Sequence, residues 1–159
     1  MKMYLGVKMI AAMAMTLTEY NQKFSKIVPN TKGEDGYLVE YEDGYKSWSP
    51  KSVFDYAYRR IDNLTFGLAI EAMRQGKCIA RKGWNGKGMF VCKQVPAEIY
   101  CNIIPKMSSL PQKAKDILFD RDKSIHYQNQ MIIVKADNTI DSWVASSSDT
   151  FAEDWQIVE

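Results

Sequence analysis

The sequence predicts an α+β fold, in which a small antiparallel sheet packs with short helices and a small hairpin-helix unit comes first. Two turn pairs, Asp43-Gly44 and Asp137-Asn138, each separate two candidate strands, which is typical of antiparallel hairpins. Capping signals for short helices lie between the predicted strands. Apolar and aromatic residues make up 46% of the 159 residues, so the chain can bury a core and is not expected to be disordered.

The first unit is expected to span residues 1–61. Residues Tyr4 to Ile10 fit a strand. Thr16 and Glu19 then have the spacing of a capping box, in which the Thr side chain covers a helix amide and the Glu side chain reaches back. The stretch "YLVEYEDGYKSWSP" alternates apolar and polar residues around Asp43-Gly44 and therefore predicts a hairpin.

A helix should follow this hairpin. Ser49 supplies an N-cap and Pro50 a proline in the first turn, where a missing amide costs nothing. The apolar face of the helix is expected to hold Val53, Phe54, Ala57 and Tyr58. Residues 59–63 then join the two units.

The second unit is expected to span residues 62–159. Thr65 can cap a helix that Gly76 ends. The apolar residues of this helix recur at helical spacing, at Phe66, Ala69, Ile70 and Met73. Two short strands follow, at Cys78–Lys82 and Met89–Val95, with a glycine-rich loop between them.

The remainder of the second unit contains an insertion and a second hairpin. The insertion, at about residues 96–127, is expected to be irregular apart from a helix at about Leu110–Phe119. The hairpin consists of strands at Met131–Lys135 and Thr139–Val144. A capped helical turn in "SSSDTFAEDW" then precedes a terminal strand at Trp155–Val158.

Charge and composition argue against several classes of protein. The net charge is +2, which makes nucleic acid an unlikely partner, because nucleic-acid-binding domains usually carry a strongly basic face. No segment approaches the ~20 apolar residues of a membrane span. The apolar run from Met9 to Leu17 is too short for a secretion signal. With an odd number of cysteines, three, we expect a cytoplasmic protein with free thiols and no membrane partner.

The usual traces of catalysis are missing. The single histidine, His126, stands between Ile125 and Tyr127 and fits a strand residue better than a zinc ligand, and there is no Cys-x-x-Cys. The loop glycines have the spacing G-x-x-G-x-G rather than that of a dinucleotide site, and no Ser or Thr follows Lys87 as a P-loop requires. We therefore predict no catalytic residue, no metal site and no cofactor.

The glycine-rich loop "RKGWNGKGMF" contains the residue types that a nucleotide-binding loop needs. Glycines allow backbone amides to turn toward an anion, and Arg81 can hold a phosphate through two hydrogen bonds. Trp84 offers a flat face for a base, and Asn85 can bind a base edge or a ribose hydroxyl. The alternative is a plain hairpin turn whose Trp packs in the core and whose lysines are solvated.

A second stretch, "DSWVASSSD", has related features. Trp143 lies at a strand end and is followed by three serine hydroxyls and the carboxylate of Asp149. Trp84 and Trp143 would then form opposite walls of one nucleotide pocket. The alternative is that Trp143 is a core residue and that Ser147 or Ser148 is a helix N-cap.

Two segments carry a resemblance to a known family. They are "LTFGLAIEAMRQGKCIARKGWNGKGMF" and "DNTIDSWVASSSDTFAEDWQIVE", which include the ordered run Arg-x-x-Trp-Asn-Gly … Asp-x-x-Ala-x-Asp-Trp. The chain closely resembles the second Thoeris anti-defence family of phages over roughly residues 64–95 and 128–159. The first 60 residues look like a small module found at the start of various phage proteins.

This resemblance implies a non-enzymatic sponge, meaning a protein that binds a signal and withholds it from its effector. The expected ligands are cyclic ADP-ribose-type signals such as glycocyclic ADP-ribose, and some relatives also take cyclic dinucleotides at a separate site, which would counter CBASS. The resemblance further implies a homotetramer with pockets between subunits, in the host cytoplasm. The predicted ligand-binding residues are Arg81, Trp84, Asn85, Gly86, Met89, Trp143, Ser147, Ser148 and Asp149.

Two other functions compete with the sponge. A nucleic-acid-binding or virion-associated module is favoured by the aromatic residues of the first hairpin, Tyr37, Tyr41, Tyr45 and Trp48. A hydrolase that degrades the same signal is the third possibility.

Overall fold

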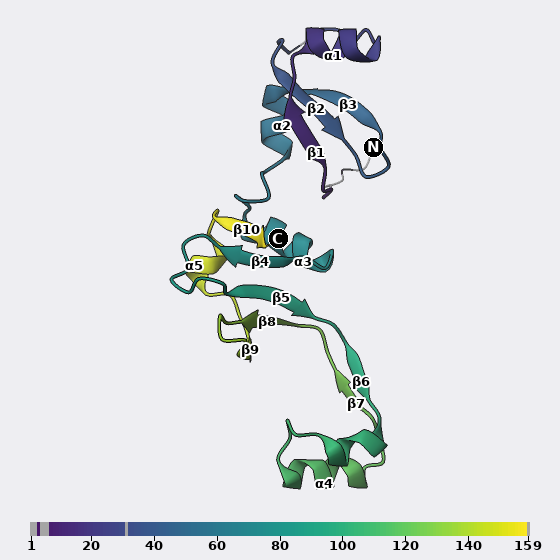
Figure 1. Ribbon diagram of the computed structural model, residues 1–159, viewed down its shortest axis with the longest axis vertical. Coiled ribbons are helices and arrows are strands. Elements are labelled where there is room, and N and C mark those ends of the chain that lie inside the picture. Colours follow the sequence, from purple (N-terminus) through teal and green to yellow (C-terminus); the bar gives the residue numbers. More distant parts are fainter. Residues whose placement is uncertain (1–2, 4–6, 31, 159) are drawn as a thin grey trace. The chain divides into compact units, whose positions relative to one another are not determined.

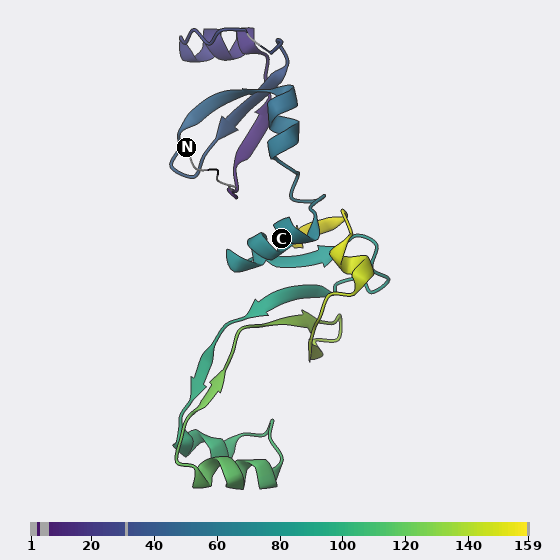
Figure 2. The ribbon, with the colours of Figure 1, turned by 180° about the vertical axis from the view of Figure 1, so that it is seen from behind.

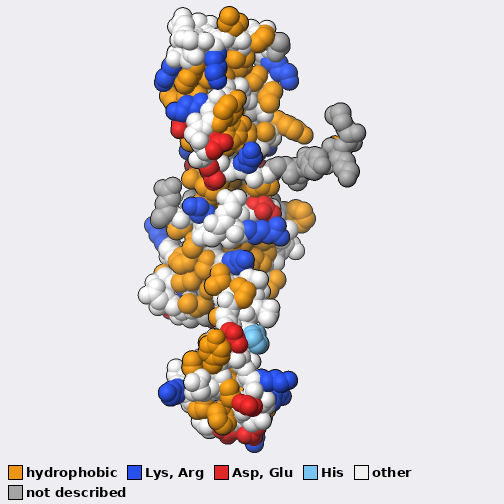
Figure 3. All heavy atoms as spheres, turned by 90° about the vertical axis from the view of Figure 1, so that its right-hand side faces the viewer, with side chains coloured by type: hydrophobic (Ala, Val, Ile, Leu, Met, Phe, Trp, Pro, Cys, Tyr) orange, Lys and Arg blue, Asp and Glu red, His pale blue; other side chains and the backbone are white. Residues whose placement is uncertain are grey.

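The computed structural model describes residues 3, 7–30 and 32–158 and divides into two compact units, Met1–Ile61 and Asp62–Glu159 (Figure 1). Each unit contains antiparallel sheet and short helices, which confirms the predicted α+β fold. Figure 3 shows one face, on which the Lys and Arg side chains of the described residues are interspersed with acidic and apolar ones. No helix among the described residues has the length and apolar character needed to cross a membrane.

The first unit is built on a three-stranded antiparallel sheet in the order β1-β2-β3. The strands are β1 (Ala11–Ala14), β2 (Gly36–Glu40) and β3 (Lys46–Pro50). Glu40 pairs with Lys46 across the turn, and Gly44 adopts a φ of 80°, so the predicted hairpin is confirmed. Of the strand expected at residues 4–10, residues 4–6 lie outside the described residues and residues 7–10 are not strand.

Two helices accompany this sheet, α1 (Leu17–Phe24) and α2 (Lys51–Ala57). Thr16 and Glu19 form the predicted capping box at the start of α1. The predicted start of α2 is wrong by one residue, since Pro50 is the N-cap and Ser49 pairs with Tyr37 within the sheet. Because that pairing commits the Ser49 backbone to the strand, the helix begins only afterwards.

The packed face of α2 is narrower than predicted. Phe54 stacks on Tyr37 with a centroid distance of 4.1 Å and contacts Tyr58 at 4.9 Å. Val53 and Ala57, expected on the same face, are exposed. Phe54 is thus the one residue of this seven-residue helix that is not exposed, and it packs on Tyr37 of β2.

The second unit is built on a five-stranded antiparallel sheet in the order β10-β4-β5-β8-β9. Its strands are β4 (Cys78–Arg81), β5 (Phe90–Gln94), β8 (Gln130–Val134), β9 (Ile140–Ser142) and β10 (Trp155–Val158). These bounds confirm the four internal strands and the terminal strand predicted from the sequence, to within two residues at each end. Because β10 pairs with β4, the end of the chain lies beside the strand that leads into the glycine-rich loop.

The helix α3 (Phe66–Arg74) packs against β10, β4 and β5 of this sheet and lies beside β4 in Figure 2. The Thr65 hydroxyl accepts from the Leu68 amide, and Gly76 has a φ of 82°, so both predicted ends are confirmed. The core of the unit consists of Leu64, Ala69, Ala72, Met73, Ile79, Val91, Ala152 and Trp155. This core fixes the strands whose ends carry the predicted site.

The insertion is more regular than predicted. Its elements are β6 (Ala97–Ile99), the 3-10 helix η1 (Cys101–Lys106), α4 (Gln112–Asp120) and β7 (Ile125–Tyr127). The predicted helix is confirmed as α4, but the expectation of otherwise irregular chain is wrong. Gln94 pairs with Gln130 and Ala97 with Tyr127, so β6 and β7 continue the register of β5 and β8 beyond Pro96. Proline has no amide to donate, which interrupts the ladder there.

Candidate functional site

Three tryptophans gather where the glycine-rich loop meets the end of the chain. Trp84 lies 6.1 Å from Trp143 and 5.5 Å from Trp155 between ring centroids, and Trp143 lies 6.0 Å from Trp155. All three pairs meet edge to face, an arrangement that aromatic rings favour. Phe66 of α3 completes this group, the tryptophan cluster, at 5.3 Å from Trp155.

The three tryptophans differ in burial. Trp155 is fully buried in the core, whereas Trp84 and Trp143 are half-buried and pack against that core. Trp84 therefore packs against the core, as the alternative to a binding loop predicted, but it is not fully buried. An exposed part of a rigidly held indole is a surface on which a base can stack.

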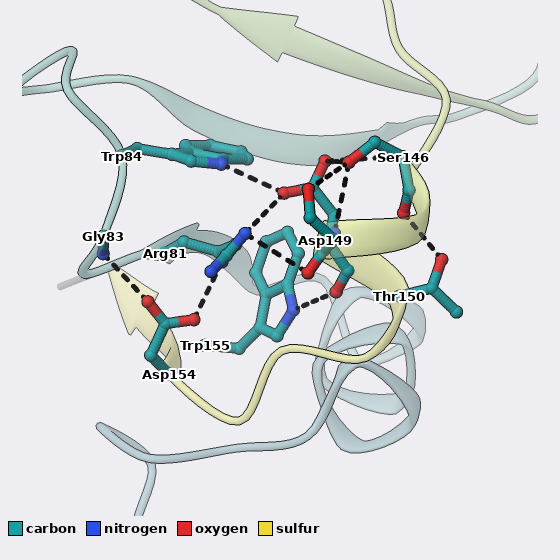
Figure 4. A network of polar contacts seen from close by, with 9 residues as sticks. Arg81, Gly83, Trp84, Ser146, Asp149, Thr150, Asp154 and Trp155 are labelled. Atoms are coloured by element: carbon teal, nitrogen blue, oxygen red, sulfur yellow. Dashed lines mark hydrogen bonds and ion pairs between the residues drawn. The ribbon is translucent and has the colours of Figure 1, made fainter.

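Asp149 fixes the orientation of Trp84 (Figure 4). Its Oδ1 atom accepts from Trp84 Nε1 at 3.2 Å and from Arg81 Nη1 at 2.9 Å. Its Oδ2 atom accepts from the Ser146 hydroxyl at 2.6 Å and amide at 3.2 Å. The backbone carbonyl of Asp149 accepts from Trp155 Nε1 at 2.9 Å. One buried residue thus binds two of the tryptophans of the cluster.

Asp149 lies in α5 (Ser147–Thr150), a single capped turn. The N-cap is Ser146, so the alternative that made Ser147 or Ser148 the N-cap is wrong. Ser146 and Asp149 form a capping box, which needs an acidic side chain at the third helical position. That geometry turns the Asp149 carboxylate inward, toward the loop.

Arg81, at the start of the glycine-rich loop, contacts residues of the second predicted stretch. Its Nε donates to Asp154 Oδ1 at 2.8 Å, and its Nη1 donates to Asp149 Oδ1 at 2.9 Å and to the Ser148 carbonyl at 3.4 Å. The side chain is only 19% exposed. Nη2 makes no hydrogen bond with the described residues, so a phosphate would meet one free nitrogen rather than the paired donors expected from the sequence.

The charges of this network shift the pKa values of its members. Hydrogen bonds from Arg81 lower the pKa of Asp154. Burial acts to raise the pKa of Asp149, but hydrogen bonds from Ser146, Arg81 and Trp84 outweigh it, and the pKa lies below its ordinary value. Both carboxylates therefore stay ionised at neutral pH.

The loop glycines serve packing as much as flexibility. The Gly83 amide donates to Asp154 Oδ2 at 2.9 Å, and a Cβ at Gly83 would lie 2.9 Å from that oxygen. A Cβ at Gly86 would lie 2.5 Å from the Met89 side chain, which is half-buried over it. Within this chain, the loop amide of Gly83 thus binds the carboxylate of Asp154, which lies outside the loop.

The other predicted ligand-binding residues are available to solvent. Asn85, Ser147 and Ser148 are exposed, and Asn85 makes no hydrogen bond with the described residues. Lys87 is also exposed and has no ion-pair partner among the described residues. Lys82 lies 3.9 Å from Asp62, at the limit of an ion pair.

Trp84 and Trp143 do not enclose a pocket within one chain. The planes of their rings are inclined at 66° to each other. A base sandwiched between two rings requires parallel ring planes with room for the base between them. The two residues therefore pack against each other and are not two opposite walls with a base between them.

The predicted ligand-binding residues leave out three others that the structure places at the site: Phe66, Asp154 and Trp155. The acidic and aromatic pair Asp154-Trp155 belongs to the ordered run quoted above, but nothing local to it indicates contact with Arg81. The contact follows from the pairing of the terminal strand β10 with β4, which places Trp155 opposite Arg81.

One cavity lies elsewhere, between η1 and α4. It measures about 250 Å³ and is lined by Pro105, Gln112, Lys115, Asp116, Phe119 and Asp120. It contains none of the predicted site residues. Within residues 3, 7–30 and 32–158, no three potential metal ligands come together.

The second unit matches a known family along nearly its whole length. A profile of the Thoeris anti-defense 2-like domain matches residues 64–158. A protein named Thoeris anti-defense 2, from Bacillus phage SP01, is 36% identical over 98 residues, which are 60% of this chain and 94% of that protein. The profile match begins after the first unit. These matches confirm the resemblance seen in the sequence, and anti-defence against Thoeris is the function class that the family name gives. The chain belongs to the Thoeris anti-defense 2-like family.

Proposed function

We propose that this protein is a sponge that binds cyclic ADP-ribose-type signals, including glycocyclic ADP-ribose, and withholds them without degrading them. The observation that carries the proposal is Trp84, a half-buried ring braced by Trp143 and Trp155 and oriented by Asp149. Family membership and the name of the Bacillus phage relative support the anti-defence role, for which the proposal adds the host cytoplasm as the place of action.

The exposed groups around Trp84 suit an aromatic, anionic ligand. A base would stack on the open part of the indole, worth ~1–3 kcal/mol. Asn85 would bind a base edge or ribose hydroxyl, and Lys87 would attract a phosphate. Capture at nanomolar concentration requires about −12 kcal/mol in all, so more than one wall must contribute.

The second wall of the pocket comes, in this proposal, from another copy of the chain. Trp84 and Trp143 contact each other, so a single chain offers one aromatic wall. A homotetramer with shared pockets meets this need, and light scattering tests it. A monomer that binds the ligand tightly would contradict the shared pocket.

A capture-and-release assay tests the sponge itself. The full chain is incubated with glycocyclic ADP-ribose and filtered, and the retained protein is then heated and its ligand chromatographed. A sponge depletes the filtrate and returns intact ligand after heating. A hydrolase returns a product, and a nucleic-acid or virion module leaves the filtrate undepleted. A parallel sample with a cyclic dinucleotide tests for the second ligand class, and so for an effect on CBASS.

A further inference from the structure

Cys78 and Cys92 face each other across the hairpin that carries the glycine-rich loop. Ile79 of β4 pairs with Val91 of β5 in antiparallel register. In this register, the residue before Ile79 lies opposite the residue after Val91, so Cys78 lies opposite Cys92. Both residues belong to these strands, which lie side by side in the sheet (Figure 1).

Both thiols project from the same face of the sheet. Ile79 and Val91 are fully buried in the core beside α3. Because successive side chains of a strand point to opposite faces, Cys78 and Cys92 point away from that core. Both residues are of intermediate burial rather than enclosed in the core.

The two side chains are also close enough to influence each other. Burial first, and then the neighbouring Cys78 thiol, raise the pKa of Cys92. Directly opposite residues of antiparallel strands have Cβ atoms about 4.5–5.5 Å apart, and a disulfide needs about 3.5–4.5 Å. A small local shift therefore allows a bond.

We propose that Cys78 and Cys92 are a modification site, at which a low-molecular-weight disulfide such as oxidised glutathione converts them into a reversible internal disulfide. One cysteine sulfur attacks the glutathione disulfide and releases one glutathione thiol. The second cysteine then attacks the mixed disulfide and releases the other. Two protein thiols lose their protons and are oxidised, and one glutathione disulfide is reduced to two thiols.

The bond would close the base of the loop that carries Arg81 and Trp84. The ring from Cys78 to Cys92 contains the whole of the glycine-rich loop. The raised pKa of Cys92 slows the first attack, but the second step is intramolecular, so the mixed disulfide does not accumulate. This inference is independent of the proposed ligand.

The remaining cysteine, Cys101, provides an internal control. It lies in η1, where its Sγ atom is 3.9 Å from the Phe119 carbonyl, and no cysteine is opposite it. Under the same oxidant it can form only a mixed disulfide or a bond to another molecule.

The test is a titration of the reduced full chain with increasing ratios of oxidised to reduced glutathione, followed by non-reducing peptide mass mapping. The proposal expects the thiols of Cys78 and Cys92 to disappear together as a Cys78–Cys92 link, in wild type and in Cys101→Ser alike. The Cys78→Ser variant should instead hold glutathione on Cys92. Amide exchange in residues 82–89 should slow in the oxidised wild type. Stable glutathione adducts on Cys78 or Cys92 in wild type, or free thiols at the highest ratio, would overturn the proposal.

Discussion

The Asp149 carboxylate accepts a hydrogen bond from the indole nitrogen of Trp84 at 3.2 Å, across 65 positions of the sequence. The same oxygen accepts from Arg81, so Arg81 helps to hold the carboxylate that orients the ring. The ring proposed to bind the ligand is thus oriented by residues that do not need to touch the ligand.

Asp149→Asn should destabilise the second unit by about 1.5–3 kcal/mol, the range for hydrogen bonds to charged groups. Both carboxylate oxygens accept hydrogen bonds, and an amide nitrogen in place of either oxygen would face donors. Urea unfolding followed by tryptophan fluorescence measures the loss. The matched control is Asp141→Asn, which breaks only an exposed ion pair with Lys135 and should change stability by less than about 1 kcal/mol. Equal losses in the two variants would contradict the role of Asp149.

Acid should weaken the second unit. The folded-state pKa values of Asp149 and Asp154 lie below the ordinary carboxyl value, about 3.9. Their contribution to stability is therefore complete above about pH 4 and is lost as the pH falls through the lowered values. Urea unfolding at a series of pH values should show this loss in wild type and a shallower one in the double variant Asp149→Asn, Asp154→Asn. The same acid dependence in both proteins would refute this explanation.

Trp84→Phe and Trp84→Ala should behave differently. Phe keeps a ring against Trp143 and Trp155 and loses only the hydrogen bond to Asp149, so the fold should persist and capture should weaken. Ala removes the ring and leaves a cavity, at a cost on the order of 2 kcal/mol, since a half-buried ring loses less than a fully buried one. Calorimetric titration and unfolding of both variants check this. Full capture by Trp84→Ala would show that the ring does not contact the ligand.

Arg81→Ala should reduce both stability and capture, whereas Lys87→Ala should reduce capture alone and only slightly. Removing Arg81 leaves the carboxylates of Asp149 and Asp154 without their cation, at about 1.5–3 kcal/mol, and releases Trp84. Lys87 is an exposed cation whose attraction to a phosphate is screened by salt. Titrations at low and high salt, paired with unfolding curves, separate the two effects. Equal small losses would mean that neither cation supports the site.

Local signals explain which parts of the fold were predictable. The capping box at Thr16, the turn at Asp43-Gly44 and the helix ends at Thr65 and Gly76 all depend on residues a few positions apart, and all were confirmed. The strand β6 was missed, and β7 was anticipated only in the interpretation of His126 as a strand residue, because three residues are too few to show alternation. Their position follows from the register of β5 and β8, which only the folded sheet reveals.

Several residues of the site could be predicted from the sequence, but the contacts between them could not. Trp84 and Trp143 stood out as aromatic residues at strand ends, and the structure brings them together. The ion pairs of Arg81 reach Asp149 and Asp154, 68 and 73 positions away, and no spacing in the sequence indicates them. These ion pairs follow from the pairing of β10 with β4. Because of them, the Arg81 guanidinium is already bound to carboxylates of its own chain.

Asn85→Ala provides the most direct test of the claim that this loop binds the ligand. Asn85 is exposed and makes no hydrogen bond with the described residues, so its loss should leave the unfolding curve unchanged. The matched control is Asn129→Ala, which removes another exposed asparagine without such a bond, in the segment between β7 and β8. In calorimetric titration with glycocyclic ADP-ribose, we expect Asn85→Ala to weaken binding about tenfold, or about 1.4 kcal/mol, and Asn129→Ala to bind as wild type does. Wild-type affinity in Asn85→Ala would contradict the account and assign the loop to the fold alone.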